Sequence, residues 1–352
     1  MSALLTVDHL SVRFPIRTGT IWSKIVGHVH AVDDVSFTIM RGETLGVVGE
    51  SGSGKTSLGL AVLRGTEPSG GSVTLAIEGR SIPVTSLDKR DLRAARQHMQ
   101  MIFQDPYASL NPRMTVRDIL SEPLVAGAGK GSYGSRQQID ALVVDIATKC
   151  GLSRDQLNRF PHAFSGGQRQ RIAIARALVL RPALVVCDEP ISSLDVSIQA
   201  QILNLLAELQ QTLGLTYLFI AHDLAAVAYV CNRVAVMYLG QIVEMGTTRQ
   251  VYFTPKHPYT EALMSAVPEP DPDAERRPIL LSGERPDPAH PPSGCRFRTR
   301  CPYATETCAA LMPPLRPAGD GHLVACHYAD DLKLRGALEL RGGTEAAVQT
   351  NG

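Results

Sequence analysis

Short apolar runs alternate with segments of helical periodicity from Leu4 to about Gly246. The apolar runs are four or five residues long, which is typical of strands buried on both faces; they lie at residues 45–48, 99–103, 184–187, 216–220 and 234–238. Helices are predicted at residues 55–64, 140–150, 167–180 and 196–213, the last with leucine and isoleucine at near-helical spacing. The alternation predicts the α/β class, with a mixed sheet covered by helices.

The pattern changes after Tyr259. A short amphipathic segment runs to about Ala266, and eight prolines then follow between residues 268 and 292. Proline cannot continue a helix or a central strand, so this tract is predicted to be a linker. We therefore divide the chain into a large domain (1–254), a histidine-proline segment with the linker (255–292), a cysteine module (293–330) and a flexible tail (331–352).

Composition restricts the function classes. The 352 residues carry a formal net charge of +1, so no global positive field attracts nucleic acid, and no nucleic-acid partner is expected. The N-terminus lacks a secretory pattern, and no run approaches the roughly 20 apolar residues of a membrane-spanning helix. A soluble cytoplasmic protein is expected.

A phosphate-binding loop follows the first buried run. The motif G-x-x-x-x-G-K-[ST] is matched by Gly49, Glu50, Ser51, Gly52, Ser53, Gly54, Lys55 and Thr56, and Ser57 continues into the predicted helix. Glycines let the backbone approach a triphosphate, Lys55 can reach the β and γ phosphates, and Thr56 can ligate Mg²⁺. ATP and Mg²⁺ are the expected ligands, against the alternative of a chance glycine-rich loop.

An acidic pair ends the run at residues 184–187. A strand that delivers Asp188 and Glu189 opposite a phosphate loop can give Asp188 to the Mg²⁺ shell and Glu189 to the attacking water as general base. The alternative is a pair of structural acids at a strand end. Cys187, inside the run, is expected to be a small buried apolar residue.

A second anion-binding motif lies between these two, formed by Ser165, Gly166, Gly167 and Gln168 at a predicted helix start. With the phosphate loop and the acidic pair, it resembles the signature of the ATP-binding cassette (ABC) family, with Phe164 in place of the usual leucine. The resemblance implies a P-loop ATPase cassette with a mixed-sheet core, a helical signature subdomain and, here, a small C-terminal metal or Fe-S appendage.

The resemblance extends to four further positions. Gln104 is similar to the Q-loop glutamine, which senses Mg²⁺ and the γ phosphate; His222 is similar to the switch histidine; Asp195 lies in a D-loop-like segment. Phe14 is similar to the aromatic residue that stacks on adenine, although it could equally be a core residue of the first strand. The family also implies that Ser165 to Gln168 act in trans, so a second ATPase subunit is required.

The segment around His257-Pro258-Tyr259-Thr260 resembles the C-terminal part of peptide importer ATPases. This implies transport of dipeptides or oligopeptides, with nickel-chelate and glutathione importers as alternatives. Two permease subunits and, indirectly, a solute-binding protein are the implied partners, at the cytoplasmic face of the membrane. A long connection at residues 15–30, containing Trp22, looks like the type that works beside a sister ATPase subunit.

Four of the seven cysteines lie close together in sequence, within residues 295–326: Cys295, Cys301, Cys308 and Cys326. Four thiolates in a reducing compartment are typical of a metal site. Resemblance to the importer subfamily implies a [4Fe-4S] cluster, with structural Zn²⁺ as the chief alternative and free thiols or disulfides as the remainder.

Two other function classes compete. A soluble ABC ATPase of DNA repair or ribosome work is disfavoured because the interval between Thr56 and Ser165 has no sustained heptads and the chain has one cassette. A metal-dependent sensor or scaffold would make the cysteine module the main site, which the complete set of ATPase motifs disfavours.

Overall fold

The computed structural model describes residues 2–18, 24–127, 133–266 and 278–340. Trp22, the prolines at 268, 270 and 272, and residues 341–352 of the expected tail lie outside the described residues.

Eight strands of the described residues form the core sheet, in the order β11-β12-β10-β9-β3-β8-β7-β6. Its parallel part comprises β3 (Thr44–Val48), β6 (Met99–Ile102), β7 (Leu184–Asp188), β8 (Thr216–Ile220) and β9 (Arg233–Tyr238). Every residue of β3, β7 and β8 is buried, as expected where both faces of a parallel sheet are covered. The five predicted strands are confirmed, each end to within one residue.

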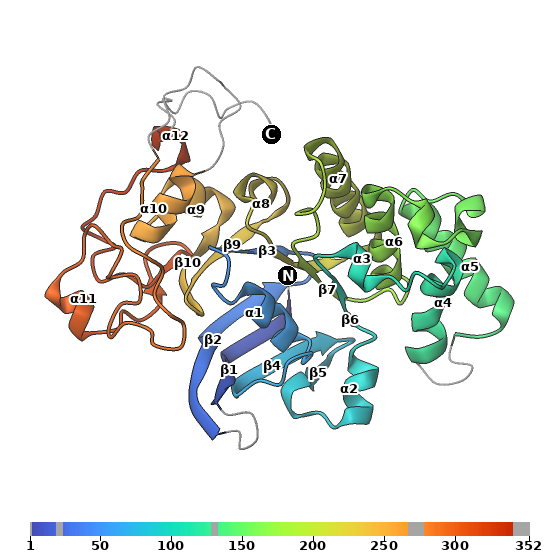
Figure 1. Cartoon of the computed structure of the whole chain (residues 1–352), viewed down its shortest axis with the longest axis horizontal. Coiled ribbons are helices and arrows are strands. Elements are labelled where there is room, and N and C mark those ends of the chain that lie inside the picture. The colour runs from blue at the N-terminus through green and yellow to red at the C-terminus, as the bar shows by residue number, and fades with distance from the viewer. Residues whose placement is uncertain (1, 19–23, 128–132, 267–277, 341–352) are drawn as a thin grey trace.

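The C-terminal third of the chain extends this sheet. Strand β10 (Gln241–Thr247) pairs antiparallel with β9 and with β12 (Leu323–Val324), and β12 pairs with β11 (Arg316–Pro317). Phe297, between these elements in sequence, is buried in the same core cluster as the central strands. The cysteine module is therefore joined to the cassette by backbone pairing and by a shared core (Figure 1).

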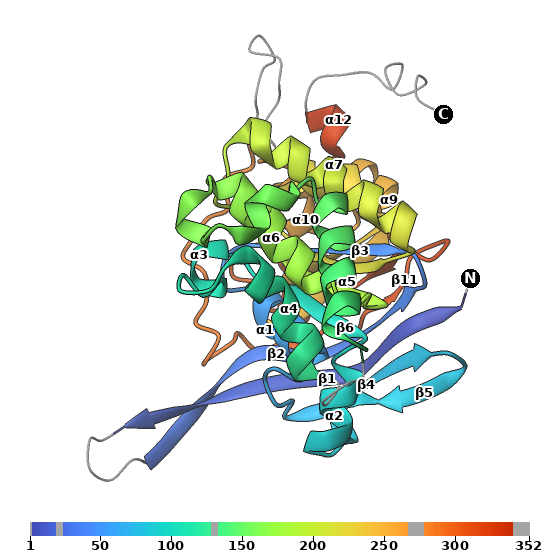
Figure 2. The same cartoon turned by 90° about the vertical axis from the view of Figure 1, so that its right-hand side faces the viewer.

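A second, antiparallel sheet has the order β2-β1-β4-β5. It contains β1 (Ala3–Thr18), β2 (Lys24–Met40), β4 (Gly70–Ile77) and β5 (Arg80–Pro83). Pairing of β1 with β2 continues to Thr18 and Lys24, so the hairpin projects as a long arm (Figure 2). The prediction of a connecting segment over residues 15–30 was wrong for residues 15–18 and 24–30, because their backbone groups pair across the hairpin.

Helices gather on both faces of the core sheet. The four predicted helices are confirmed as α1 (Lys55–Val62), α5 (Arg136–Lys149), α6 (Gly166–Leu178) and α7 (Val196–Leu213). The chain leaves α7 at Gly214, whose φ of +65° favours glycine. The other helices are α2 (Lys89–Ala95), α3 (Pro106–Ser109), α4 (Val116–Gly127), α8 (Leu224–Val230), α9 (Thr248–Phe253), α10 (Pro258–Ser265), α11 (Glu306–Ala310) and α12 (Ala337–Leu340), with 3₁₀ turns at Val84–Ser86, Arg154–Asn158 and Pro161–Ala163.

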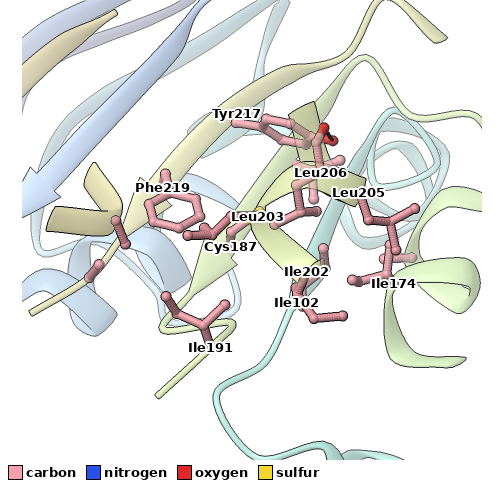
Figure 3. Close-up of a cluster of buried hydrophobic side chains, with 14 of the residues drawn as sticks. Ile102, Ile174, Cys187, Ile191, Ile202, Leu203, Leu205, Leu206, Tyr217 and Phe219 are labelled. Atoms are coloured by element: carbon pink, nitrogen blue, oxygen red, sulfur yellow. Dashed lines mark hydrogen bonds between the residues drawn. The ribbon is translucent and has the colours of Figure 1, made fainter. Parts of the chain in front are cut away.

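The apolar faces of α6 and α7 pack on the sheet. Ile202 and Leu206 of α7 belong to the same buried cluster as Ile174 of α6 and Phe219 of β8 (Figure 3). Cys187 is fully buried in this cluster, and burial raises the pKa of its thiol. The prediction that Cys187 is a small buried apolar residue is confirmed.

The predicted flexible tail covers residues 331–352, of which the structure describes residues 331–340. Ala337 and Leu340 of α12 are buried, and the Arg335 backbone N–H donates to Glu261 at 3.0 Å. The prediction was wrong for residues 331–340, because two apolar side chains and a buried carboxylate hold this segment. None of the helices in the described ranges combines the length and apolar character that crossing a membrane requires.

Candidate ATP site

The phosphate loop occupies the turn between β3 and α1. Gly54, the residue before α1, has φ +105°, and a Cβ added there would lie 1.9 Å from the Ala31 carbonyl oxygen. A Cβ at Gly49 would lie 2.2 Å from the Met237 carbonyl oxygen. Only glycine therefore lets the loop pass this close to neighbouring backbone.

Lys55 lies under the loop. Its Nζ donates to the carbonyl oxygens of Gly49 at 2.8 Å and Glu50 at 3.0 Å, and the residue is 5% exposed. Burial lowers the pKa of Lys55, while the carboxylates of Glu189 and Asp188 oppose that shift. The ammonium is therefore a fixed, largely desolvated cation at the start of α1, where anions are attracted.

Asp188 ends β7 next to the phosphate loop. The Thr56 hydroxyl donates to Asp188 Oδ1 at 3.0 Å. Burial raises the pKa of Asp188, and the Thr56 hydrogen bond opposes the shift. A hydroxyl and a carboxylate thus lie side by side, which is the oxygen donor set that Mg²⁺ prefers.

Glu189 follows at the point where the strand turns. Its φ of +45° is uncommon for a side-chain-bearing residue, and its N–H donates to the Ile220 carbonyl oxygen at 2.9 Å. Two polar groups converge on Glu189 Oε2: Gln104 Nε2 at 2.8 Å and His222 Nδ1 at 3.1 Å. Three residues that are far apart in sequence meet at one carboxylate oxygen.

These groups share one cavity of about 520 Å³. Among the predicted site residues, Ser51, Gly52, Gly54, Lys55, Thr56, Ser57, Gln104, Glu189 and His222 line it. Asp188 does not line the cavity itself but accepts a hydrogen bond from Thr56, which does. The cavity has the size of a small-molecule site.

Sequence reasoning missed the rest of the lining. Val29 and Ala31 of β2 form one wall, and Pro288 comes from the proline-rich tract predicted to be a linker. The guanidinium of Arg285 also lies over the loop, where a Cβ at Gly52 would be 2.9 Å from Nη1. The spacing of the prolines did not predict that Arg285 and Pro288 lie at the ATP cavity, because only the tertiary structure brings this tract there.

Phe14 does not line the cavity. Its side chain is 41% exposed on β1, opposite Val29 on β2, and Val29 is the lining residue. The prediction that Phe14 is a core residue is wrong, because its side chain is exposed. Adenine stacking by Phe14 stays a prediction.

The signature residues lie outside the chain's own cavity. Ser165 is exposed at the N-cap of α6, and its hydroxyl and backbone N–H form a reciprocal capping box with Gln168. A Cβ at Gly167 would lie 2.5 Å from Ile198 Cγ2 of α7, so glycine permits the close packing of the two helices. Asp195 is exposed at the N-cap of α7.

The four clustered cysteines converge on a small cavity. Cys295, Cys301, Cys308 and Cys326 line a space of about 20 Å³. All seven thiols are free, and burial raises the pKa of Cys301 to about 12 and that of Cys326 to about 11. No group of three or more histidine, cysteine or acidic side chains in the described ranges has a metal-binding arrangement. The thiols are adjacent, but their arrangement is not that of a ligand set.

Comparisons with known proteins agree with the motif order. Residues 32–192 match the ABC transporter family, and residues 243–308 match the oligopeptide/dipeptide transporter C-terminal region. The chain is 51% identical over 326 residues to a probable peptide ABC transporter ATP-binding protein of Sinorhizobium fredii, covering 92% of this chain and 90% of the relative. It is 50% identical over 332 residues to the oligopeptide transport ATP-binding protein OppF of Escherichia coli, covering 94% and 97%.

Solved structures share the fold. The dimeric ATP-binding cassette MJ0796 bound to ADP and phosphate superposes with a TM-score of 0.58 at 24% identity, covering 70% of this chain and 99% of that one. CbiO1 from Clostridium perfringens gives 0.59 at 25% identity, covering 71% and 91%. The chain therefore belongs to the ABC transporter ATPases, and it carries the C-terminal region of the oligopeptide/dipeptide transporters.

Proposed function

We propose that this chain binds ATP and Mg²⁺ in the 520 Å³ cavity and hydrolyses ATP to power the import of peptides. The observation that carries the proposal is the convergence of Gln104 and His222 on Glu189 Oε2, beside Lys55 and Thr56. A carboxylate held in this way next to a phosphate loop is suited to accept a proton from water attacking the γ phosphorus.

In this mechanism, the loop amides and Lys55 bind the β and γ phosphates. The Thr56 hydroxyl and Asp188 would hold Mg²⁺, assisted by Gln104, and the ion would offset charge that develops on the phosphate oxygens. Glu189 Oε2 takes the water proton as the new oxygen–phosphorus bond forms and the bond to the bridging oxygen breaks, yielding ADP and phosphate. His222 holds Glu189 in position.

A second ATPase subunit completes the site. The signature residues lie outside the chain's own cavity, and Ser165 is exposed at the start of α6. This helix start is therefore accessible to ATP bound by a partner. Asp195 is exposed at the start of α7 and follows Leu194, which lies against Gly166 of the signature. We infer a head-to-tail pair, with a sister subunit as partner.

Peptides are the proposed cargo because the relatives named for peptide import cover nearly the whole chain. The chain would work at the cytoplasmic face of the membrane, bound to two permease subunits and served by a solute-binding protein. Reconstitution with permeases encoded nearby tests this, with labelled dipeptide, oligopeptide, nickel chelate and glutathione as substrates. ATP-dependent peptide uptake supports the proposal. Uptake of only nickel chelate or glutathione would reassign the cargo, and permease-independent ATP hydrolysis would favour a soluble role.

We propose further that the four clustered thiols hold a metal centre. The proposal is supported by the convergence of four free thiols on one cavity. The thiols are not arranged as a ligand set here, and a space of about 20 Å³ holds little more than one water, so they must rearrange around any metal. A [4Fe-4S] cluster or Zn²⁺ would neutralise the thiolates and stabilise a module with few regular elements.

Anaerobic purification followed by iron, sulfide and zinc assays tests the metal centre. Cys301→Ser should lower the metal content, whereas Cys150→Ser, at a buried thiol that does not line the cysteine cavity, should leave it unchanged. A wild-type protein free of iron and zinc would contradict the proposal.

A further inference from the structure

One residue of the phosphate loop is held by the C-terminal third of the chain. The Glu50 carboxylate accepts two hydrogen bonds from Arg300 Nη1, at 2.9 and 3.1 Å. The Glu50 backbone N–H donates to the Tyr259 hydroxyl at 2.8 Å. Glu50 is not among the described residues that line the ATP cavity, so its side chain faces the C-terminal module instead.

Both partners of Glu50 are themselves fixed. Tyr259 is fully buried, with ring centroids 4.7 Å from Tyr238 and 5.4 Å from Phe297. The Arg300 side chain is 10% exposed, and the Arg300 backbone N–H donates to the Phe297 carbonyl oxygen at 2.9 Å. Packed rings therefore position the hydroxyl and the guanidinium that meet Glu50, and little freedom is left to either group.

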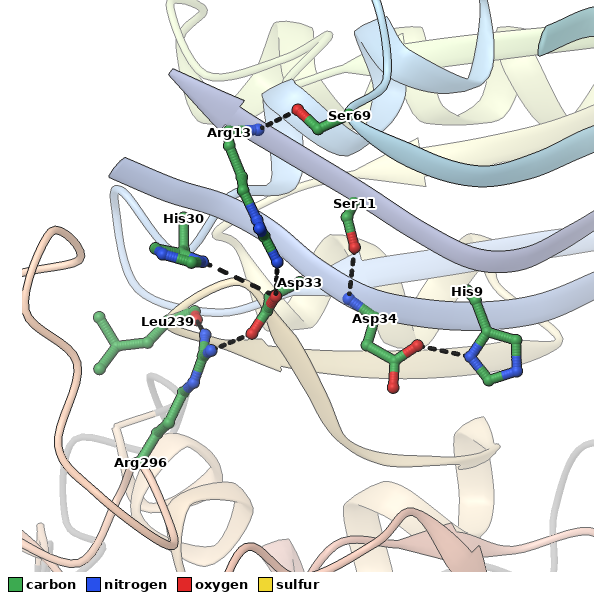
Figure 4. A network of polar contacts seen from close by, with 9 residues as sticks. All are labelled: His9, Ser11, Arg13, His30, Asp33, Asp34, Ser69, Leu239 and Arg296. Atoms are coloured by element: carbon green, nitrogen blue, oxygen red, sulfur yellow. Dashed lines mark hydrogen bonds and ion pairs between the residues drawn. The ribbon is translucent and has the colours of Figure 1, made fainter. Parts of the chain in front are cut away.

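Arg296, four residues before Arg300, makes a second contact between the cysteine module and the cassette. Arg296 is 6% exposed, pairs with Asp33 of β2 and donates to the Leu239 carbonyl oxygen (Figure 4). Asp33 follows closely after Ala31, whose carbonyl oxygen lies against Gly54. Residues 295–301 thus contact both the phosphate loop and the strand that lies beside it.

We propose that Arg300 is a positioning residue for ATP binding: through Glu50 it holds the phosphate loop in the conformation that binds phosphates. The proposal rests on the proposed ATP site. The backbone amides of the loop bind phosphates tightly only if the loop already has its bound conformation. A more mobile loop must be ordered when ATP binds, and this cost lowers the affinity for ATP. The Arg300 side chain is 10% exposed and that of Glu50 is 28% exposed, so the pair is partly desolvated and removal of either partner leaves a charge without its counterion.

Substitution of Arg300 with a matched control tests this role. Arg300→Met removes the charge but keeps most of the apolar stem, and we expect it to weaken Mg-ATP binding roughly five- to tenfold in calorimetry on the full chain. In turnover assays the KM for ATP should rise while kcat changes little. Arg298→Met is the control, because Arg298 belongs to the same module but donates to Ser293. Arg300→Lys, which keeps the charge, should recover part of the affinity.

A double-mutant cycle with Glu50→Gln separates positioning from general stability. If Arg300 acts through Glu50, Arg300→Met should have little further effect on ATP affinity in the Glu50→Gln background. Tyr259→Phe supplies a second route, since it removes only the hydroxyl that Glu50 contacts, and it should also weaken ATP binding. The Tyr259→Phe variant still tests the proposal if Arg300→Met does not fold.

Three results would overturn the inference: folded Arg300→Met and Tyr259→Phe proteins that bind ATP like the wild type, equal losses in Arg298→Met, or fully additive effects in the cycle. Lys55→Ala separates this failure from failure of the ATP site itself. A wild-type chain that binds no ATP, or binds it no better than Lys55→Ala, would contradict the proposed function. Normal ATP binding that is insensitive to Arg300 and Tyr259 would contradict only the positioning role.

Discussion

The side-chain amide of Gln104 donates to Glu189 Oε2 at 2.8 Å, so the end of β6 is tied to the end of β7 at a single carboxylate. The two residues follow the carboxyl ends of β6 and β7, which are neighbouring parallel strands, so they lie side by side. The amide also fixes the orientation of the carboxylate, whose oxygen then faces the cavity.

Glu189→Gln should abolish hydrolysis while preserving ATP binding. The amide keeps the size of the side chain but cannot take the proton of the attacking water, so we expect turnover to fall by a factor of roughly 10² to 10⁴. The variant should also accumulate as an ATP-bound dimer, measurable by light scattering. Unchanged turnover would remove Glu189 from the role of general base.

Gly54→Ala should destroy ATP binding. The new Cβ would lie 1.9 Å from the Ala31 carbonyl oxygen, so the loop must move out of its position. Gly214→Ala is the matched control: Gly214 also has a positive φ, +65°, but nothing lies within 4 Å of the added Cβ. The control should lose about 1 kcal/mol of stability and retain ATP binding. Equal ATP affinities for the two variants would contradict the structural role of Gly54.

Ser165→Arg should separate ATP binding from hydrolysis. Ser165 is exposed at the start of α6, outside the chain's own cavity, so ATP affinity of the isolated chain should stay near the wild-type value. Hydrolysis by the assembled pair should fall by roughly 10²-fold or more, because the bulky side chain would block the signature surface from the partner's ATP. Loss of ATP binding by the isolated chain would argue against action in trans.

His257 should make stability sensitive to mild acid. Burial lowers its pKa to about 3, and its Nδ1 accepts the Tyr259 N–H at 3.1 Å. Between about pH 6.5 and 3 the unfolded chain binds a proton that the folded chain excludes, so the free energy of unfolding falls by up to about 1.4 kcal/mol per pH unit as pH drops.

Urea unfolding between pH 7 and 5 measures this effect. His257→Asn, which keeps an acceptor at the helix start, should lower the slope. His290→Asn is the control, because the His290 side chain is 84% exposed. A slope unaffected by His257→Asn would show that other groups govern the acid sensitivity.

Much of the fold followed from local chemistry. The buried strands are short apolar runs, and α7 carries its leucines at helical spacing and ends at a glycine with positive φ, so these elements are specified within a few residues of sequence. The long β1–β2 arm was mistaken for a connection because its residues are largely exposed and lack a clear apolar alternation. Pairing across the hairpin, which sequence periodicity does not record, makes it a sheet.

By itself, the sequence determined the phosphate loop, the acidic strand end and the signature, because each needs particular residue types at fixed short spacing. Only the tertiary structure decided which residues meet. Gln104, Glu189 and His222 converge because parallel strands end at one edge of the sheet. Arg300 reaches Glu50 across 250 residues because the C-terminal module shares a core and a sheet with the cassette. Such contacts depend on the packing of whole elements, and no short stretch of sequence encodes them.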